Sequence, residues 1–432
     1  MKMANMDDYF DVVIVGTGAA GLYCALNLPA RYRILLLTKQ KADESDSFLA
    51  QGGICMQHGE ADYRPFFDDT MRAGHYENNP ATVDLMIRSS NSIIRDLVRR
   101  GVRFARDDHG ALRFTREGAH SRPRILFHED ITGHEITQTL LNEVLRCENI
   151  ELREHTTLLD FFADASACGG VIAADPDGEP RAIGAGAVVL ACGGIGGLYK
   201  NSTNFPHITG DAIAMALRHG VACEHLDYIQ IHPTTLYSHR KGRRFLISES
   251  VRGEGALLLD KNGNRFTNEL QPRDVVSAAI RAQMEKDGID HVWEDMRPIG
   301  EAAIREHFPN ILERCEEEGY DPIHEPIPVV PAQHYFMGGI TADLSSRTAL
   351  PRLYACGETC CNGVHGRNRL ASNSLLESLV FAQRAADDIL YGEPPVFTGD
   401  KPDLAPYREQ EPLFAAYRQE VLTAIERSKK HE

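Results

Sequence analysis

The stretch FDVVIVGTGAAGLYCALNL, residues 10–28, decides the fold of this chain. It opens with the almost continuous apolar run DVVIV, which is typical of a parallel strand buried on both faces. Gly16, Gly18 and Gly21 follow with the spacing G-x-G-x-x-G, and the rest of the stretch is typical of a helix. In that context the glycines permit a tight turn, a close approach of pyrophosphate to the backbone, and helix–strand packing. The stretch therefore predicts a dinucleotide site at the positive end of the helix.

The next predicted strand, RILLL at residues 33–37, bears on which dinucleotide is bound. It ends in Thr38 and Lys39, whereas NAD sites usually carry an acid here for the ribose hydroxyls. This departure disfavours NAD and leaves FAD open, with Thr38 and Lys39 as candidate ribose contacts.

Two later strands complete the predicted sheet. AVVLACGG at residues 187–194 runs into paired glycines, and LYACGE at residues 353–358 ends in Glu358. That acid could bind ribitol or ribose hydroxyls. Because the first and last of these strands lie near opposite ends of the chain, we expect one sheet built from both ends, with an inserted domain between.

Length and charge narrow the function further. The chain has 432 residues, more than the roughly 300 at which single cores stop growing, so two or more domains are expected. A formal net charge of −16 argues against nucleic-acid binding and against a polybasic hold on anionic membranes. No apolar run approaches the ~20 residues of a membrane span. The polar start MKMANMDDYF leaves no room for a signal peptide, so we expect a cytoplasmic protein.

The cysteines point away from metal chemistry. Ten of them are scattered without a CxxC pair, so neither a zinc site nor an iron–sulfur ligand set is expected. Cys360 and Cys361 are adjacent, and they either pack beside a turn or form a redox-sensitive pair.

Three further blocks carry a resemblance to a known family. They are FLAQGGI (residues 48–54), RGEGALLLDKNGNRF (252–266) with PRD (272–274), and HGRNRLASNSLLE (365–377). With the glycine motif they resemble the flavoprotein family of succinate dehydrogenase, fumarate reductase and L-aspartate oxidase, over almost the whole chain. The resemblance implies an α/β fold with a discontinuous Rossmann-like FAD-binding domain, residues 1–225 and 335–392. An inserted α+β capping domain, residues 226–334, and a short C-terminal helical segment, residues 393–432, complete it.

Within the family, REGAHSRPRILFHEDITGHEI at residues 116–136 is most similar to the substrate-side segment of the L-aspartate oxidases. The resemblance implies oxidation of L-aspartate to iminosuccinate, with hydride passing to flavin N5 and fumarate or dioxygen as electron acceptor. This reaction opens a route towards quinolinate and NAD, which makes quinolinate synthase a candidate partner. Relatives with covalent flavin carry a histidine where this chain has Asp46, so the FAD should be noncovalent.

The C-terminal region departs from the family pattern. Aspartate oxidases often have a longer helical domain there, whereas residues 397–406 resemble a linker and a single docked helix is expected after it. The apolar stripe predicted for that helix comprises Leu413, Phe414, Tyr417, Val421, Leu422 and Ile425. A smaller departure is Arg367, where the family usually has alanine.

The glycine motif, the strand ends and the family blocks supply the candidate FAD contacts. These are Gly16, Thr17, Gly18, Ala19, Ala20, Gly21, Thr38, Lys39, Ser45, Ser47, Ala50, Gln51, Gly52, Gly53, Ala191, Gly193, Asp211, Glu358, Asn373, Ser374 and Leu375.

A four-carbon dicarboxylate with an amine calls for several fixed donors, preferably arginine forks and histidines. The family blocks supply the candidates His232, Ser248, Glu249, Arg273, His334 and Arg369. The two histidines and Arg369 would hold carboxylates, and Ser248 would either add a hydroxyl donor or cap a turn. Arg273 would lie beside the flavin, where it either delivers a proton supplied by a relay or shields developing charge.

The segment TREGAHSRPRIL, residues 115–126, gathers arginines in an acidic chain. Eight arginines lie between residues 99 and 124, and they would steer an anionic substrate. Glu117 would oppose a dicarboxylate, but it would bind the amine of aspartate and so select aspartate over succinate. The alternative is that Glu117 forms a plain ion pair with Arg116 or Arg122.

Two other functions stay open at this point. A soluble fumarate reductase or a succinate dehydrogenase flavoprotein subunit would share the fold, although its counterpart of the TREGAHS segment looks different. A flavin-binding protein without catalysis is the second alternative, and the set of substrate-type residues disfavours it.

Overall fold

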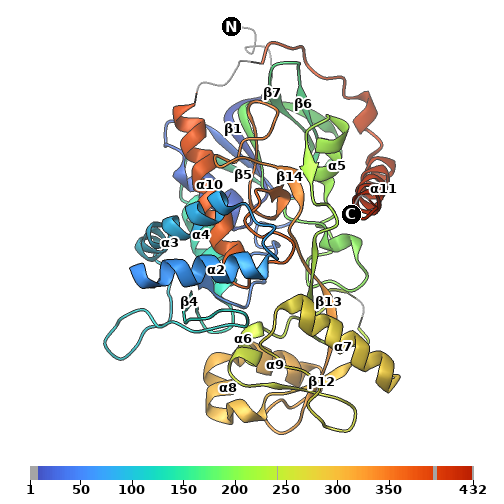
Figure 1. Ribbon diagram of the computed structural model, residues 1–432. Helices are drawn as coiled ribbons and strands as arrows, with labels where there is room; N and C mark the ends of the chain where they lie inside the picture. Colours follow the sequence, from blue (N-terminus) through green and yellow to red (C-terminus); the bar gives the residue numbers. More distant parts are fainter. Residues whose placement is uncertain (1–7, 241, 393–396, 431–432) are drawn as a thin grey trace.

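The computed structural model describes residues 8–240, 242–392 and 397–430. The polar N-terminal residues 1–7 and parts of the predicted C-terminal segment therefore lie outside the described residues. Figure 1 shows a larger α/β body above a smaller one, and β10 (Ile229–Leu236) and β13 (Ile327–Phe336) carry the chain between them.

The larger body is built on a seven-stranded sheet with the order β5-β2-β1-β8-β7-β6, and β15 also pairs with β8. The strands are β1 (Tyr9–Val15), β2 (Ile34–Leu37), β5 (Ile150–Arg153), β6 (Thr157–Ala163), β7 (Cys168–Ala174), β8 (Pro180–Leu190) and β15 (Leu353–Ala355). β7 pairs antiparallel with both β6 and β8. The pairs β1–β2, β1–β8, β2–β5 and β8–β15 are parallel. Val188 pairs with both Val13 and Leu353, so strands from the two ends of the chain flank β8.

Helices cover both faces of this sheet. They are α1 (Ala19–Asn27), α2 (Tyr63–Ala73), α3 (Pro80–Arg100), α4 (Thr132–Val144), α5 (Asp211–Arg218), α10 (Asn373–Tyr391) and α11 (Gln410–Ser428). Val12 and Ile14 of β1 join the core that contains α1, α3, α4 and α10, whereas Val13 and Val15 join the core that contains α5 and α11. Because both faces are buried, β1 needs the apolar run that its sequence shows.

The smaller body is an antiparallel sheet with the order β10-β13-β12-β11 and helices packed on it. Its other elements are α6 (Glu249–Gly253), β11 (Leu257–Leu259), α7 (Arg273–Asp287), β12 (Val292–Asp295), α8 (Glu301–His307) and α9 (Pro309–Glu317). Buried side chains such as Ile247, Val276, Ile280 and Ile311 form a core of its own. We refer to this body as the cap.

We call the junction of the larger body and the cap the seam. Several short strands pair outside the two main sheets. β9 (Cys223–Glu224), β14 (Gly339–Thr341) and β16 (Cys360–Cys361) form a small sheet, and β3 (Ile54–Cys55) pairs with β4 (Ile125–Leu126). Single 3-10 turns lie at Glu60–Asp62, Gly196–Leu198, Arg297–Ile299, Gly357–Thr359 and Ala405–Tyr407. Within the described ranges, no helix is both long and apolar enough to cross a membrane.

The predicted α/β class, with an inserted cap and a short C-terminal helix, is confirmed. Three details are wrong. β8 begins at Pro180 and ends at Leu190, and β15 ends at Ala355 because a 3-10 turn follows it. Leu422 is 39% exposed, since the buried face of α11 repeats every four residues through Tyr417, Val421 and Ile425.

Candidate active site

A cavity of about 420 Å³ lies where the parallel sheet meets the cap. Its wall includes Val15, Leu37 and Ala191, which stand at or just beyond the carboxyl ends of three neighbouring strands. Arg273 and Phe245 reach it from the cap side. Ligands of open α/β sheets bind at this edge of the sheet, so the cavity is the candidate site.

Two motif glycines are required by close approach. A Cβ added to Gly16, whose φ is +114°, would lie 2.0 Å from the carbonyl oxygen of Ala191. A Cβ on Gly21 would lie 1.9 Å from the carbonyl oxygen of Gly16. The turn between β1 and α1 therefore presents bare backbone to the cavity, as a pyrophosphate requires.

Polar atoms around this turn fit a dinucleotide. Ser45 Oγ and Gln51 Oε1 are buried without a hydrogen-bond partner among the described residues, and both residues line the cavity. Buried polar atoms normally have partners, so these two are suited to a bound ligand. Lys39 Nζ forms an ion pair with Asp211 at 2.6 Å, and both line the same cavity. The residues present therefore fit FAD.

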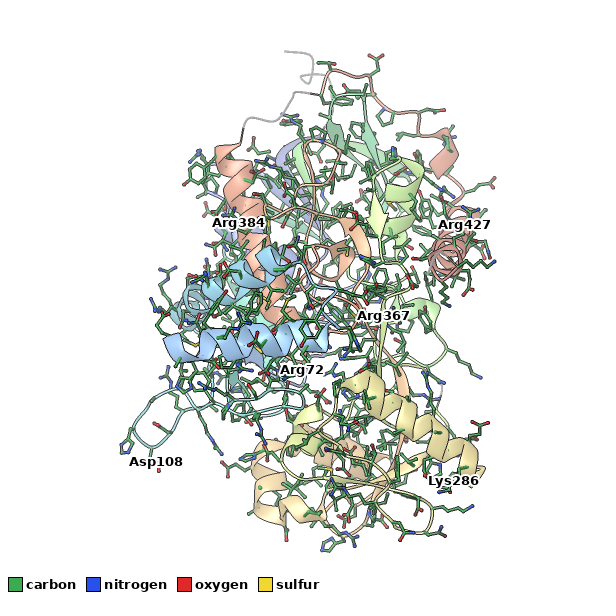
Figure 2. The ribbon with its side chains drawn as sticks, viewed as in Figure 1. Arg72, Asp108, Lys286, Arg367, Arg384 and Arg427 are labelled. Atoms are coloured by element: carbon green, nitrogen blue, oxygen red, sulfur yellow. The ribbon has the colours of Figure 1, made fainter. Side chains whose placement is uncertain are left out.

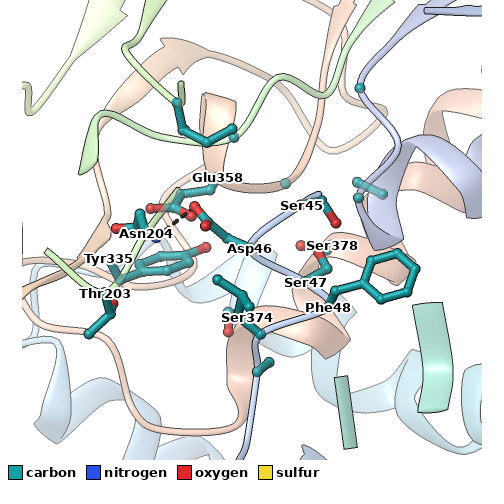
Figure 3. A pocket seen from close by; sticks show the side chains of 18 of the residues that line it. Ser45, Asp46, Ser47, Phe48, Thr203, Asn204, Tyr335, Glu358, Ser374 and Ser378 are labelled. Atoms are coloured by element: carbon teal, nitrogen blue, oxygen red, sulfur yellow. Dashed lines mark hydrogen bonds between the residues drawn. The ribbon is translucent and has the colours of Figure 1, made fainter. Parts of the chain in front are cut away.

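Asp46, the residue from which a noncovalent flavin is expected, lies on the wall of the cavity (Figure 3). Its carboxyl group accepts hydrogen bonds from Asn204 Nδ2 at 2.6 Å and from the Phe205 N–H at 2.9 Å. Burial raises the pKa of Asp46 to about 6 and that of the neighbouring Glu358 to about 8. Glu358 thus keeps its proton at neutral pH, whereas Asp46 is mainly ionised there, and either form can contact hydroxyls. A carboxyl group cannot form the histidyl link to flavin.

Two guanidinium groups converge at the cap end of the cavity. Arg273 Nη1 and Arg369 Nε donate to the same oxygen, Gln230 Oε1, at 2.9 and 3.3 Å. Arg273 Nε also donates to Glu249, and Arg369 Nη1 donates to Ser374 Oγ at 2.6 Å. Sharing one acceptor leaves other N–H groups of both arginines for an anionic ligand.

The charges of these groups follow from their surroundings. Burial and the charge of Arg273 lower the pKa of Arg369 to about 10, which keeps it cationic at neutral pH. Burial acts to raise the pKa of Glu249, but Arg273 and Arg252 outweigh it and lower that pKa. Arg252 Nη2 lies 3.7 Å from Glu249, so the carboxylate joins two arginines.

The two predicted histidines lie side by side at different depths. His334 lines the cavity, and its Nδ1 is 2.7 Å from Thr203 Oγ1. His232 is fully buried behind it, is absent from the cavity wall, and packs edge-to-face at 5.1 Å between ring centroids. Burial, with the charge of Arg273, holds both pKa values well below the usual range. Both rings are therefore neutral, and His334 is the one that can reach a ligand.

Glu117 lies on the cavity wall and is buried. Its two oxygens accept hydrogen bonds from Ser250 Oγ at 3.0 Å and from Ser372 Oγ at 2.6 Å. Burial and the charge of Glu249 raise its pKa. Arg116 is exposed and Arg122 donates to the Ala61 carbonyl, so the ion-pair alternative for Glu117 is not what the structure has.

Ser248 combines the two roles that the sequence left open. It is the N-cap of α6, where its Oγ accepts from the Ser250 N–H at 3.2 Å, and it also lines the cavity. Because a hydroxyl both donates and accepts, capping leaves its proton free for a ligand.

The predicted steering patch of arginines is wrong. Five of the eight arginines between residues 99 and 124 form ion pairs with acids, namely Arg99, Arg100, Arg103, Arg113 and Arg124. Arg124 is fully buried against Asp62 and Asp69. Arg106 belongs to a projecting loop whose outer end Asp108 marks (Figure 2). These ion pairs offset much of the positive charge of the cluster, and the stretch from residue 99 to 124 could not reveal them because the paired acids lie outside it.

Most of the predicted site residues meet in this one cavity. Those on its wall are Gly16, Thr17, Gly18, Ala20, Thr38, Lys39, Ser45, Ser47, Ala50, Gln51, Gly52, Gly53, Glu117, Ala191, Gly193, Asp211, Ser248, Glu249, Arg273, His334, Glu358, Arg369, Ser374 and Leu375. Ala19, Gly21, His232 and Asn373 lie behind the wall. Of these, Ala19 donates its N–H to Ser47 Oγ at 3.0 Å, and Asn373 donates to Thr70 Oγ1 at 3.1 Å.

Sequence reasoning missed several residues of the site. Gln230 is on the same face of β10 as His232, so the two-residue period of a strand could have found it. Ser372 stands inside the block of residues 365–377, and Ser250 lies two residues before the block that begins at Arg252, so both blocks could have drawn attention to them. Thr203 and Asn204 follow no motif, and only the folded chain reveals them.

Comparisons with known proteins agree with this arrangement. A family model described as an FAD binding domain matches residues 11–375. An L-aspartate oxidase of Clostridium perfringens is 48% identical over 380 residues, which cover 88% of this chain and 86% of that protein. One from Nostoc sp. is 44% identical and covers 98% of this chain and 76% of its own. Among solved structures, a quinol fumarate reductase of E. coli has a TM-score of 0.83 at 30% identity, with 95% of this chain and 74% of that chain covered. The chain therefore belongs to the FAD-binding family of succinate dehydrogenase and fumarate reductase flavoproteins, in the branch of the L-aspartate oxidases.

Proposed function

We propose that this chain uses FAD to oxidise L-aspartate to iminosuccinate. The observation that carries the proposal is the pairing of two converging arginines with a buried acid in one cavity. Succinate and fumarate would need the arginines alone, whereas aspartate also presents an ammonium group. Relatives named L-aspartate oxidase, which are similar over most of the chain, support the same reaction.

The arginines and His334 are the groups proposed to hold the two carboxylates. Arg273 and Arg369 offer planar forks that match a carboxylate, and their aim is fixed by Gln230. His334 is neutral and keeps one ring N–H as a donor when Thr203 donates to Nδ1. Ser248 adds a hydroxyl. Holding both ends of a four-carbon chain fixes the position of its α-carbon.

Glu117 is the proposed partner of the amine. Its two serine contacts leave further lone pairs on each oxygen for an ammonium group. A positive substrate group also offsets the repulsion between Glu117 and Glu249. Desolvation makes such a charge pair selective, because a ligand without the amine leaves the carboxylate unpaired.

FAD, when bound, would supply the two-electron acceptor for the hydride that leaves the substrate α-carbon. The ammonium group must first give a proton to a base, for which the adjacent Glu117 carboxylate is the proposed acceptor, so that the nitrogen lone pair can form the C=N bond. The predicted contacts on the cavity wall are proposed to hold it without a covalent link, since Asp46 replaces the linking histidine. Arg273 shields the charge that develops near its carboxylate. Glu249 lies between Arg273 and Arg252 and so fixes the position of the Arg273 guanidinium.

One anaerobic experiment tests the reaction. L-Aspartate is added to the purified holoenzyme, and the absorbance band of oxidised flavin is followed, with succinate as the comparison. Loss of the band with aspartate, and its return on adding fumarate or dioxygen, is the expected result. Loss with succinate but not with aspartate would favour a succinate dehydrogenase or fumarate reductase instead. An unchanged band with both would leave a flavin-binding protein without catalysis.

Two consequences of this function stay predictions. Iminosuccinate would pass to a quinolinate-forming enzyme such as quinolinate synthase, and the reaction would take place in the cytoplasm.

A further inference from the structure

We propose that Ser250 and Ser372 are positioning residues that aim Glu117 and keep it ionised, and that they thereby set the preference for an amino dicarboxylate. The inference rests on the proposed function, because it concerns how Glu117 meets the amine. It adds two hydroxyl groups to the residues that decide specificity.

The geometry places Glu117 between the two bodies. Ser250 belongs to α6 of the cap, and Ser372 immediately precedes α10 of the larger body. Each donates one hydrogen bond to a different oxygen of the carboxylate. The side chain of Glu117 is therefore held from both sides of the seam, in one orientation.

The side chain of Glu117 is tightly enclosed by its neighbours. A Cβ added to Gly52 would lie 2.8 Å from Glu117 Oε1, so the glycine makes room for the carboxylate. Ser372 adopts the left-handed conformation with φ of +61°, which is uncommon for a residue with a side chain. Backbone strain of this kind persists where the surrounding structure enforces it, often at a functional site. Here the conformation delivers the Ser372 hydroxyl to Glu117 Oε2.

The electrostatics give the two serines a second task. The charged groups that act on Glu117 are Glu249 of α6 and Arg273 of α7, while the nearby buried thiol of Cys55 in β3 stays neutral because its pKa is raised. Burial and Glu249 raise the pKa of Glu117, whereas both serine hydrogen bonds and Arg273 lower it. Removing a serine hydroxyl removes a bond that favours the ionised form. The acid would then be neutral over a wider pH range and unable to pair with an ammonium group.

The test compares two reactions of the same holoenzyme, aspartate oxidation and dye-driven fumarate reduction. Ser372→Ala and Ser250→Ala are each expected to lower the ratio of kcat/KM for aspartate to that for fumarate by about tenfold, the usual size of a hydrogen bond to a charged group. The acidic limb of the aspartate pH profile should move to higher pH. Ser250→Thr, which keeps the hydroxyl, should restore both.

Two further variants separate the hydroxyl from the backbone. Ser372→Gly removes the hydroxyl without strain at positive φ, so it should behave like Ser372→Ala. Ser346 is also buried with φ of +62°, its hydroxyl donates to the Phe381 carbonyl at 2.8 Å, and it is not on the cavity wall. Ser346→Ala is therefore the matched control, and it should leave the ratio unchanged.

A coupling measurement decides whether the serines act through Glu117. In a Glu117→Gln background, either serine replacement should have no further effect on the ratio. An equal loss on both reactions, or an effect that persists in that background, would overturn the inference. A wild-type enzyme that oxidises aspartate while the serine variants keep its ratio would overturn this inference alone. Failure of the wild type to oxidise aspartate would overturn the proposed function as well.

Discussion

Gln230 is a single side chain on which both substrate-side arginines depend. Its Oε1 accepts from Arg273 and Arg369, and its Nε2 donates to Asn368 Oδ1 at 2.8 Å and to the Arg369 carbonyl at 2.7 Å. It is buried and absent from the cavity wall, so it acts on a ligand through the arginines.

Gln230→Leu should lower kcat/KM for aspartate oxidation and for fumarate reduction alike, by roughly 10- to 100-fold, because two buried guanidinium groups lose their shared acceptor. Steady-state kinetics on both substrates measure this. Gln230→Glu, which keeps the acceptor and adds a charge, is the comparison. A loss confined to aspartate would contradict the account, since Gln230 has no contact with Glu117.

For single residues, the sequence predicts which side chains belong to the site better than it predicts which side chains they contact. Arg273, Arg369 and Glu117 were identified from family blocks and from the chemistry of the substrate, and all three lie on one wall. His232 lies behind the ring of His334 and not on the cavity wall. This position depends on side-chain packing between β10 and β13, which no motif encodes. The arginine cluster misled because the acids that pair with it, from Asp62 to Glu306, all lie outside the stretch that holds the arginines.

Helix α11 reaches the nucleotide end of the cavity through one aromatic ring. Lys39 Nζ lies 4.8 Å from the centroid of the Phe414 ring while it pairs with Asp211. Val421 of the same helix packs near Gly210, whose φ of +73° starts α5 just before Asp211. The helix thus stabilises the lysine proposed to contact the FAD ribose.

Phe414→Ala should raise the Kd for FAD by about two- to tenfold, the range of a partly buried cation–π contact. Flavin fluorescence on dilution of the holoenzyme measures that release. Leu413→Ala removes a neighbouring packed side chain of α11 and should lower stability without changing the flavin Kd. Equal flavin Kd values for the two variants would sink the idea.

Inside the cap, β12 carries a buried acid that the fold tolerates at a cost. Both oxygens of Glu294 lack a hydrogen-bond partner among the described residues, and burial raises its pKa from 4.5 to about 8. The folded chain therefore binds a proton that the unfolded chain releases between these two pH values. Linkage then requires the free energy of unfolding to fall as pH rises through this window.

Glu294→Leu should remove that slope and raise the free energy of unfolding by about 2–4 kcal/mol at alkaline pH. Denaturant titrations of wild type and variant, at pH values below and above the window, measure the difference. Glu294→Gln separates loss of charge from gain of apolar packing. A variant whose stability falls with pH as steeply as the wild type would disprove the assignment.

Elements were predicted with different success for physical reasons. The apolar run of β1 needs burial on both faces and is legible in the sequence. β8 begins earlier than predicted because its first half pairs with β7, a partner that local apolarity does not announce. Leu422 was assigned to the wrong face because the stripe of apolar residues on α11 is wider than the face that the helix buries.

On the scale of the whole molecule, Asp130 fastens the cap to the larger body. Its Oδ1 accepts from Asn310 Nδ2 at 2.6 Å, and its Oδ2 accepts from the Ile311 N–H at 2.8 Å, in the first turn of α9. A carboxylate at a helix N-terminus satisfies donors that the helix cannot. Asp130 and Asn310 also line the cavity, so this contact lies at the substrate side of the seam.

Asp130→Ala should loosen the cap, increase proteolytic cleavage in the connections to it, and raise KM for aspartate more than it lowers kcat. The expected loss of unfolding free energy is about 1–2 kcal/mol, as for a lost helix cap. Limited proteolysis with and without a dicarboxylate, together with kinetics, measures these effects. Asp130→Asn keeps one acceptor and should be milder. Identical digestion patterns for wild type and Asp130→Ala would show that Asp130 does not hold the cap to the larger body.

The pairing of Val188 with both Val13 and Leu353 has a consequence for synthesis on the ribosome. The cap can fold around its own core while the C-terminal part of the chain is still in the ribosomal exit tunnel. One edge of β8, however, stays unpaired until Leu353 emerges. An unpaired strand edge can form β-sheet hydrogen bonds with another chain. A chain truncated before Leu353 would lack Glu358 and Arg369 and would expose an unpaired edge of β8. Such a truncation should therefore yield aggregates rather than a weakly active enzyme.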